Sequence, residues 1–363
     1  MSNDAIKEYV KPYIDDEFKR EWEKRCSKYP DDFANRGNIL PPVNKIIVIG
    51  DLHGDWKMTL DILDHAKVIK KSNPNIWTGG DTVIVQLGDQ IDRCRGSGAQ
   101  CHSEGFTKND ENNDWKILKY MTKLHSEALK SGGAVYSLLG NHELMNVEGD
   151  FRYVSYKGLA EFGDSRDYNS GIKERKKKFS RENGEIANFL GCTRYGVLVI
   201  GSNLFVHGGI TDLMKEKYPE LEGLAELNRV VSRYLWNQLN KDKKSILDSA
   251  DYSPFWNRVL GTCDTGTGPE EVCSKLEEQL KVYQIPDKPN VNRIIIGHTP
   301  QYFYGLGANK TCSGKVVRAD VGLSQAFDTA DKNLSMIQKR NSNRKPQYIE
   351  ILNDNQINIK IIN

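Results

Sequence analysis

The sequence has no long apolar run and no excess of charge of either sign. No stretch of its 363 residues reaches the ~20 consecutive apolar residues that a membrane-spanning helix needs. The N-terminal residues are polar and acidic, without the apolar core of a secretion signal. The formal net charge is only +2, so no global basic field argues for nucleic acid as a partner. We therefore expect no membrane and no nucleic-acid partner.

Cysteine is scarce, and its count is odd. The chain has seven cysteines, which are Cys26, Cys94, Cys101, Cys192, Cys263, Cys273 and Cys312. An odd number without close pairing and without a secretion signal favours reduced thiols and a cytoplasmic location. The group of Cys94, Cys101 and His102 leaves two alternatives open, a zinc site or a loop-closing disulfide, although zinc sites usually contain two tightly spaced cysteine pairs.

Internal repeats are also absent, and the spacing of apolar segments favours one main domain over residues 41–363. Aromatic residues recur at roughly helical spacing over 1–40, which predicts a helical extension before that domain. The Gly-, Ser- and Asn-rich stretch 94–113 is predicted to be a mobile loop. Residues 145–195 are predicted to form a helical insertion, and its basic run 173–178 is interpreted as a solvated helix face rather than a binding patch.

Five short polar segments each follow an apolar run that resembles a buried strand. They are 50–55 (Gly-Asp-Leu-His-Gly-Asp), 88–93 (Gly-Asp-Gln-Ile-Asp-Arg), 140–143 (Gly-Asn-His-Glu), 207–209 (His-Gly-Gly) and 297–299 (Gly-His-Thr). Helical stretches separate the first three, a pattern typical of an α/β fold with parallel strands. Catalytic groups lie at the carboxyl ends of such strands, so the segments are predicted to converge. The later runs 316–319, 348–351 and 357–361 are predicted to be closing antiparallel strands.

The five segments contain enough Asp, His and Asn to bind two adjacent metal ions. The candidate ligands are Asp51, His53, Asp89, Asn141, His207 and His298. Asp51 and His53 are expected to bind one ion, and Asp89 is the expected bridge to the second. This mixed nitrogen and oxygen set suits manganese, with iron or zinc as alternatives, better than calcium or a lone magnesium. Two such ions about 3.5–4 Å apart activate water for attack on a phosphate ester.

Three further residues are candidates for catalysis. His142 follows Asn141 and is placed to protonate the leaving alkoxide. Asp92 is expected to hydrogen-bond His142 and hold its imidazole protonated, and Arg93 is expected to bind phosphate oxygens through both guanidinium arms. A single Asp or His after a strand is more often a helix cap or a core residue. The prediction therefore depends on five motifs occurring together and in order.

With these motifs the chain resembles the calcineurin-like metallophosphoesterases and, more narrowly, the phosphoprotein phosphatases, whose signatures are GDxHG, GDxxDR, GNHE, HGG and GHT. The runs 139–154 and 205–210 are similar to the Shewanella-like protein phosphatases. The resemblance covers roughly residues 45–325 and implies an α/β/β/α sandwich of two mixed β-sheets flanked by helices. It also implies the same six metal ligands, His142 as the acid and Arg93 as a phosphate clamp.

The resemblance also implies a second phosphate-binding arginine in a Trp-x-x-Arg-like stretch. Arg258, in the segment Pro-Phe-Trp-Asn-Arg at 254–258, resembles it, and Asn141 is a further candidate for phosphate binding. Arg152 is another candidate, although a salt bridge that fixes the insertion explains it equally well. One position departs from the family, because Cys94 follows Arg93 where glycine is usual. We therefore expect a differently shaped loop beside the substrate groove.

The activity implied by the resemblance is hydrolysis of phosphomonoesters on a phosphorylated protein substrate, at serine or threonine, with tyrosine as an alternative. A diadenosine polyphosphate hydrolase shares all five motifs, and the run 145–154 favours the phosphatase over it. A non-catalytic scaffold is the third hypothesis. His142 and Arg93 argue against a scaffold, because a structural metal site needs neither.

Overall fold

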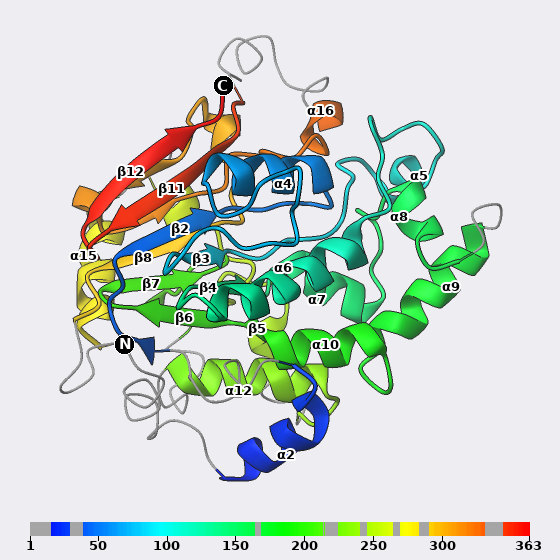
Figure 1. The fold of residues 1–363 in the computed structure, drawn as a ribbon, viewed down its shortest axis with the longest axis horizontal. Helices are drawn as coiled ribbons and strands as arrows, with labels where there is room; N and C mark the ends of the chain where they lie inside the picture. The colour runs from blue at the N-terminus through cyan, green and yellow to red at the C-terminus, as the bar shows by residue number, and fades with distance from the viewer. Residues whose placement is uncertain are drawn as a thin grey trace.

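The computed structural model describes residues 16–29, 39–163, 168–212, 214, 224–239, 245–263, 269–282, 290–330 and 344–363. Strands in these residues form two mixed sheets of six strands each, and helices flank them (Figure 1). This arrangement confirms the α/β/β/α sandwich. None of the helices in the described part of the chain has the length and apolar character that crossing a bilayer requires.

The first sheet contains the strands that carry the first three motifs. In spatial order its strands are β12 (Gln356–Ile361), β11 (Gln347–Leu352), β2 (Lys45–Ile49), β3 (Val83–Gln86), β4 (Ala134–Leu138) and β5 (Arg194–Tyr195). Strands β2 to β5 are parallel, as the alternation of strands and helices predicts. The two C-terminal strands add to β2 in antiparallel fashion, which confirms that prediction. They form one edge of the sheet (red in Figure 1).

The second sheet carries the other two motifs. Its order is β1 (Ile39–Leu40), β6 (Val197–Ile200), β7 (Asn203–Val206), β8 (Arg293–Ile296), β10 (Val316–Arg318) and β9 (Asn309–Thr311). Strand β10 is parallel to β8 and antiparallel only to β9. The expectation of a closing antiparallel strand at 316–319 is therefore confirmed for the pairing with β9 and wrong for the pairing with β8. An apolar run predicts a buried strand, but it carries no information about which neighbour the strand pairs with.

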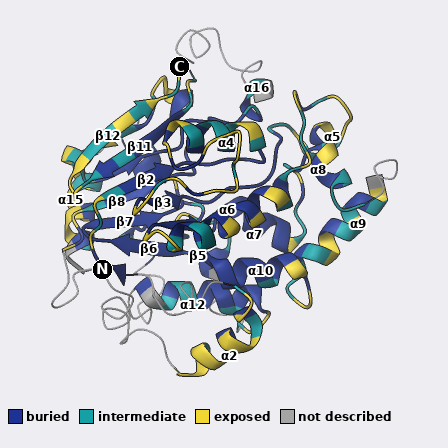
Figure 2. Cartoon of the chain, in the orientation of Figure 1, coloured by how far each residue is buried: buried dark blue, intermediate teal, exposed yellow. Residues whose placement is uncertain are grey.

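Helices surround the two sheets (Figure 1). They are α2 (Asp16–Cys26), α4 (Trp56–His65), α5 (Gly98–Cys101), α6 (Asp114–Leu129), α7 (Asn141–Glu148), α8 (Tyr156–Ala160), α9 (Tyr168–Phe179), α10 (Glu185–Thr193), α12 (Leu224–Leu235), α14 (Val259–Thr262), α15 (Pro269–Val282) and α16 (Phe327–Ala330). One apolar core contains Ile47 of the first sheet together with Phe205 and Val317 of the second. A second core joins the outer face of the second sheet to α10 and α12. Both sheets are accordingly buried over most of their length (Figure 2).

The predicted N-terminal extension is partly described. Helix α2 buries Trp22 and Cys26, while its other face is exposed (Figure 2). Residues Ile39 and Leu40 form β1 and pair with β6, so the end of the extension is part of the second sheet. Residues 1–15 and 30–38 lie outside the described residues. The division at residue 40 stays a prediction.

Six of the seven cysteines form disulfides. The pairs are Cys26–Cys192, Cys94–Cys101 and Cys273–Cys312, with Cα–Cα distances of 5.4, 5.6 and 5.1 Å. The seventh cysteine, Cys263, is buried. The expectation of reduced thiols is therefore wrong. The first pair is not evident from the sequence, because its two cysteines are 166 residues apart and meet only in the folded chain. Disulfides are typical of oxidising compartments, so the cysteine argument for a cytoplasmic location no longer holds.

The stretch 94–113 is cross-linked and hydrogen-bonded at several points, and its mobility stays a prediction. The Cys94–Cys101 disulfide closes its first part, and the short helix α5 begins with a reciprocal cap between Ser97 and Gln100. The imidazole Nε2 of His102 lies 2.8 Å from a backbone carbonyl of the predicted insertion. Composition shows only that these polar residues cannot form a core, and it does not reveal the cross-link and hydrogen bonds that this segment makes.

Candidate active site

The five motifs converge because each follows the carboxyl end of a strand. Strands β2, β3 and β4 are parallel to one another, as are β7 and β8, so each sheet presents its motifs at one edge. Two hydrogen bonds join the motifs of the first sheet to those of the second. His207 Nδ1 lies 2.8 Å from the carbonyl oxygen of Leu87, and the backbone N–H of His298 donates to Asp51 Oδ2 at 3.1 Å.

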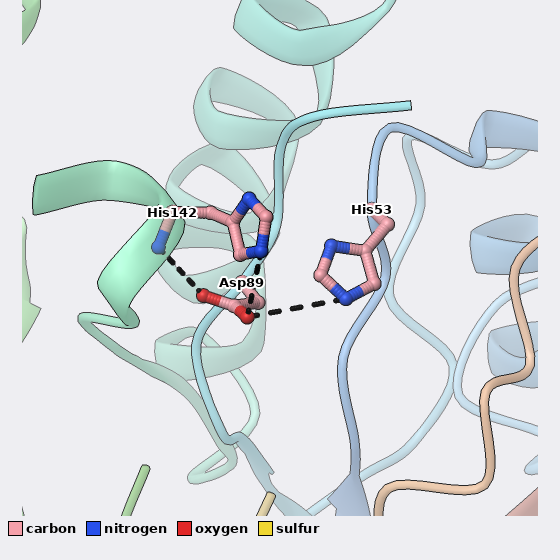
Figure 3. A group of neighbouring side chains, drawn as sticks. All are labelled: His53, Asp89 and His142. Carbon is pink, nitrogen blue, oxygen red and sulfur yellow. Dashed lines mark hydrogen bonds and ion pairs between the residues drawn. The ribbon is translucent and has the colours of Figure 1, made fainter. Parts of the chain in front are cut away.

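Asp89 is the centre of the site. Its Oδ2 lies 3.9 Å from His53 Nε2 and 3.8 Å from His142 Nε2, and the two rings approach it from different segments (Figure 3). Its Oδ1 lies 3.4 Å from His207 Nε2. The ligand atoms of Asp89, His207 and His298 lie within 4.8 Å of one another, as do those of His53, Asp89 and His142. One carboxylate is thus shared by two groups of potential ligands.

The other candidate ligands lie at the same place. Asp51 Oδ2 is 3.8 Å from His53 Nε2, and Asn141 Oδ1 is 2.9 Å from His207 Nε2. The structure therefore brings together all six residues that the sequence analysis selects as metal ligands.

Several site residues have positive φ angles, which are unfavourable for residues other than glycine and require support from the surrounding structure. The φ angles of His53, Asp89, Asp92 and His298 are 44°, 51°, 73° and 63°. Such positive values are uncommon for residues other than glycine and concentrate at functional sites. Gly140 has a different constraint, because a Cβ at this position would overlap the Asp89 carboxylate.

Hydrogen bonds orient the imidazoles and leave their metal-binding nitrogens available. Nδ1 of His53 is 3.2 Å from the Ile91 carbonyl oxygen, so Nε2 faces the carboxylates. Burial, reinforced by the charge of Arg95, lowers the pKa of His53 well below its usual value. Burial and then the charge of Arg258 do the same for the pKa of His298. Both rings are consequently neutral at physiological pH, which is the form that binds metal.

The carboxylates of the site also fit divalent cations. Burial, then the charges of Asp320 and Asp89, raises the pKa of Asp51 well above its usual value. Burial is also the main cause that raises the pKa of Asp320 to about 6. Asp320 Oδ2 is buried and has no hydrogen-bond partner within the described residues. Crowded, buried carboxylates beside the neutral imidazoles of His53 and His298 form a donor set suited to manganese, iron or zinc.

Asp320 was not selected from the sequence. It lies just beyond β10, and the only signal was its place after the apolar run 316–319. Its carboxylate reaches the motifs because β10 runs parallel to β8, and an apolar run does not reveal that pairing.

His142 is hydrogen-bonded as a general acid requires. Its Nδ1 lies 2.7 Å from Asp92 Oδ2, and the ring is almost completely buried. Asn146 donates to the other oxygen of Asp92 at 2.8 Å. This carboxylate fixes the orientation of the ring.

Arg175 supports this pair from the predicted insertion. Its Nε donates to Asn146 Oδ1 at 2.6 Å, and its Nη2 lies 2.7 Å from Asp114 Oδ2 and 3.5 Å from Asp92 Oδ1. Arg175 is completely buried, so the interpretation of 173–178 as a solvated face is wrong for this residue. It lies on the inner side of α9 with Phe179, whereas Lys176 and Lys177 are exposed. The helical spacing of four residues places Arg175 and Phe179 on the same buried side of α9, whereas the basic composition of the run does not show which residues are buried.

Replacing Arg175 with methionine is expected to lower the free energy of unfolding by ~3–5 kcal/mol, because two buried carboxylates lose their cation. Lys177→Met, on the exposed side of the same helix, is the matched control and should change it by less than ~0.5 kcal/mol. Chemical denaturation measures both. A stability of Arg175→Met equal to that of the control would contradict the buried network.

A cavity of about 340 Å³ opens beside the Asp89 group. It is lined by His53, Asp89, Arg95, Asn141, His142, Tyr153, Trp256, Arg258, His298, Thr299, Pro300, Phe303, Tyr304 and Phe327. Polar groups gather at the motif residues, and aromatic rings form much of the remaining wall. The cavity therefore suits a substrate with an anionic head and an apolar body.

The candidate phosphate-binding arginines lie in different places. Arg258 lines the cavity, where its Nη1 donates to the carbonyl oxygen of His298 at 2.5 Å. Arg93 does not line it, because its buried guanidinium pairs with Asp55 at 2.5 Å. Arg152 is exposed and pairs with Asp150 at 2.6 Å. Arg95, which the sequence analysis did not consider, does line the cavity. The only signal for it was a second arginine two residues after the motif.

These features define a phosphoesterase site. The model of the calcineurin-like phosphoesterase family matches residues 44–302, and the chain therefore belongs to the calcineurin-like phosphoesterase family of hydrolases.

Comparison with individual proteins shows which members of this family the chain is similar to. The chain is 29% identical over 334 residues to Shewanella-like protein phosphatase 2 of Arabidopsis thaliana, which covers 82% of this chain and 76% of that protein. It is 34% identical over 237 residues to an uncharacterised protein of Acanthamoeba polyphaga mimivirus, covering 59% of this chain and 90% of the other. A cold-active protein-tyrosine phosphatase of a psychrophile Shewanella species has the same fold, with a TM-score of 0.57 and 22% identity over 89% of this chain and 82% of that one. The similarity to Shewanella-like protein phosphatases is thus confirmed.

Proposed function

We propose that this chain is a metal-dependent protein phosphatase that uses two divalent cations. The observation that carries the proposal is Asp89, whose two carboxylate oxygens each face a different group of imidazoles. Asp51 and His53 would hold one cation, and Asn141, His207 and His298 the other, with Asp89 shared. Manganese is the expected metal.

Bound divalent cations would supply Lewis-acid stabilisation of charge on the phosphate group and would make water a nucleophile at neutral pH. The protein supplies the remaining functions. His142, oriented by Asp92, donates a proton to the leaving alkoxide from the cavity wall. Arg258 binds a phosphate oxygen at the edge of the same cavity. The apolar wall limits the access of bulk water, which strengthens these electrostatic interactions.

The substrate class follows from the relatives and the cavity wall. Two relatives are named protein phosphatases, which supports a phosphorylated protein as the substrate. Tyr153, Trp256 and Phe327 on the wall offer more contact to a phosphotyrosine ring than to a serine or threonine side chain. We therefore expect phosphotyrosine peptides to be substrates, with phosphoserine and phosphothreonine peptides compared in the same panel.

Removal of metal is expected to abolish hydrolysis of phosphopeptides, and added manganese is expected to restore it. The reason is that divalent cations held by the Asp89 group would lower the pKa of bound water and so make it a nucleophile at neutral pH. The measurement is phosphate release from a serine, threonine and tyrosine phosphopeptide panel by chelator-treated protein, with and without added metal.

A diadenosine polyphosphate assayed beside the panel distinguishes the two enzyme hypotheses. Faster hydrolysis of the dinucleotide would replace the protein phosphatase by a nucleotide hydrolase. Full activity of the chelator-treated, metal-free protein would overturn metal dependence. Absence of hydrolysis from every substrate in the presence of metal would leave only a scaffold.

A further inference from the structure

We propose that Arg95 binds the phosphate group of the substrate and so takes the role that the sequence assigns to Arg93. This inference rests on the proposed phosphatase function and identifies a residue of the same site. It follows from the different surroundings of two arginines that are only two residues apart.

The charge of Arg93 is already neutralised. Its Nη1 pairs with Asp55 and lies 3.2 Å from Ser324 Oγ, and its Nη2 donates to the carbonyl oxygen of Asn109 at 3.2 Å. Asp55 also caps α4 by accepting from the N–H of Met58 at 2.9 Å. Turning Arg93 toward the cavity would leave a buried carboxylate without its cation, which is strongly unfavourable.

Arg95, in contrast, hydrogen-bonds only to backbone carbonyl oxygens within the described residues. Its only hydrogen bonds within the described residues run from Nη1 to the carbonyl oxygens of Asp92, at 3.3 Å, and Cys94, at 2.6 Å. In that part of the chain no carboxylate pairs with it, and its Nε and Nη2 donate to no protein group. A half-buried guanidinium with unused donors beside a cation site is suited to bind an anion in bidentate fashion.

Two aromatic rings hold this guanidinium in the cavity. Its central carbon lies 4.7 Å from the ring centre of Phe327 and 5.5 Å from that of Tyr153. The backbone supports the same position, because the N–H of Cys94 donates to the carbonyl oxygen of Tyr153 at 3.1 Å. The Cys94–Cys101 disulfide then fixes the segment that carries Arg95.

Arg95 and Arg258 are placed to act together. Arg258 Nη1 donates to the carbonyl oxygen of His298 in one ligand group. Arg95 lies over the ring of Phe327, whose centre is 5.5 Å from that of His53 in the other group. Both arginines line the cavity that contains Asp89. A phosphate bound across the two groups would therefore meet one guanidinium from each side.

The test compares Arg95→Ala and Arg95→Lys with wild type in the manganese-loaded full chain. We expect Arg95→Ala to weaken competitive inhibition by inorganic phosphate, and to raise KM for p-nitrophenyl phosphate, by ~10–100-fold, as expected for one lost charged hydrogen-bond partner. Arg95→Lys should recover part of the loss, because it keeps the charge but not the fork. Arg20→Ala, at an exposed position of α2, is the control.

Thermal unfolding separates binding from stability. We expect the Arg95 variants to unfold close to wild type and Arg93→Ala to unfold at a clearly lower temperature. An inhibition constant for phosphate that is unchanged in both Arg95 variants would overturn the proposal. Calorimetric binding of inorganic phosphate requires no turnover. If wild type hydrolyses no ester, an Arg95-dependent affinity would still support the role of Arg95 while the proposed function fails.

Discussion

Asp89→Asn is expected to lower kcat/KM for phosphate esters by a factor on the order of 10³ or more and to reduce the bound metal. The carboxylate is the group shared by both sets of imidazoles, and its two oxygens face His207 on one side and His53 on the other. An amide retains the shape but loses the negative charge and one of the two anionic oxygens. Metal-ion catalysis contributes several kcal/mol, so loss of one cation gives an effect of this size.

The protein's own electrostatics support the same expectation. Burial acts to raise the pKa of Asp89, but neighbouring His207 and His142 outweigh burial and hold that pKa well below its usual value. Asp89 is therefore ionised throughout the pH range in which a phosphatase works. The asparagine variant removes a charge that is present in the active enzyme.

Elemental analysis and steady-state kinetics on the same preparation check this prediction. Asp81→Asn, which changes an exposed aspartate beside the start of β3, is the matched control and should retain both metal and rate. If Asp89→Asn keeps its full metal content and its rate, Asp89 does not bridge two cations. A thermal unfolding profile close to that of the control excludes a general loss of fold.

His142→Asn is expected to retain the bound metal while the rate falls by ~10²–10⁴ for esters with poor leaving groups. Alkyl phosphates need a proton on the leaving oxygen, whereas p-nitrophenolate leaves without one. The loss should therefore be smaller with p-nitrophenyl phosphate than with a phosphoserine peptide. The 2.7 Å contact between His142 Nδ1 and Asp92 Oδ2 is the structural basis, because it fixes the orientation of the ring whose Nε2 faces the Asp89 group.

The geometry leaves one competing role for His142, since its Nε2 lies within ligand distance of the Asp89 group. Metal content distinguishes the two roles. Loss of a cation in His142→Asn would identify His142 as a ligand, and equal rate losses on both substrates would argue against the acid. His65→Asn, at an exposed position of α4, controls for the substitution itself.

The convergence of the six candidate metal ligands was predictable from the sequence because local structure determines where these residues lie. Each follows an apolar run directly, and the carboxyl ends of parallel strands must meet at one sheet edge. The hydrogen bond between Asp92 and His142 follows similarly, because both residues belong to motifs on the adjacent strands β3 and β4. For such residues, strand order and short spacing leave little freedom.

The arginines were not predictable in the same way. Whether Arg93 or Arg95 reaches the cavity depends on Asp55. This residue lies in another motif, and its carboxylate forms an ion pair with Arg93 that keeps the Arg93 guanidinium out of the cavity. The burial of Arg175 likewise depends on Asp114, 61 residues earlier in the chain. The direction of a long side chain is set by such tertiary partners, and one sequence does not reveal them.

The disulfides were missed for the same reason. Cys26 and Cys192 become neighbours only when α2 packs beside α10, and nothing close to either residue in the sequence predicts that contact. Cys94 and Cys101 are only seven residues apart, and for that pair the sequence analysis did retain a loop-closing disulfide as an alternative.

The most direct test of a shared carboxylate between two cations is the position and number of the metal ions in the wild-type protein. Crystals grown with manganese and measured at its absorption edge should give two anomalous peaks about 3.5–4 Å apart, one on each side of Asp89. Elemental analysis of the same protein should give two equivalents per chain. A single peak, or two peaks that do not share Asp89, would contradict the account.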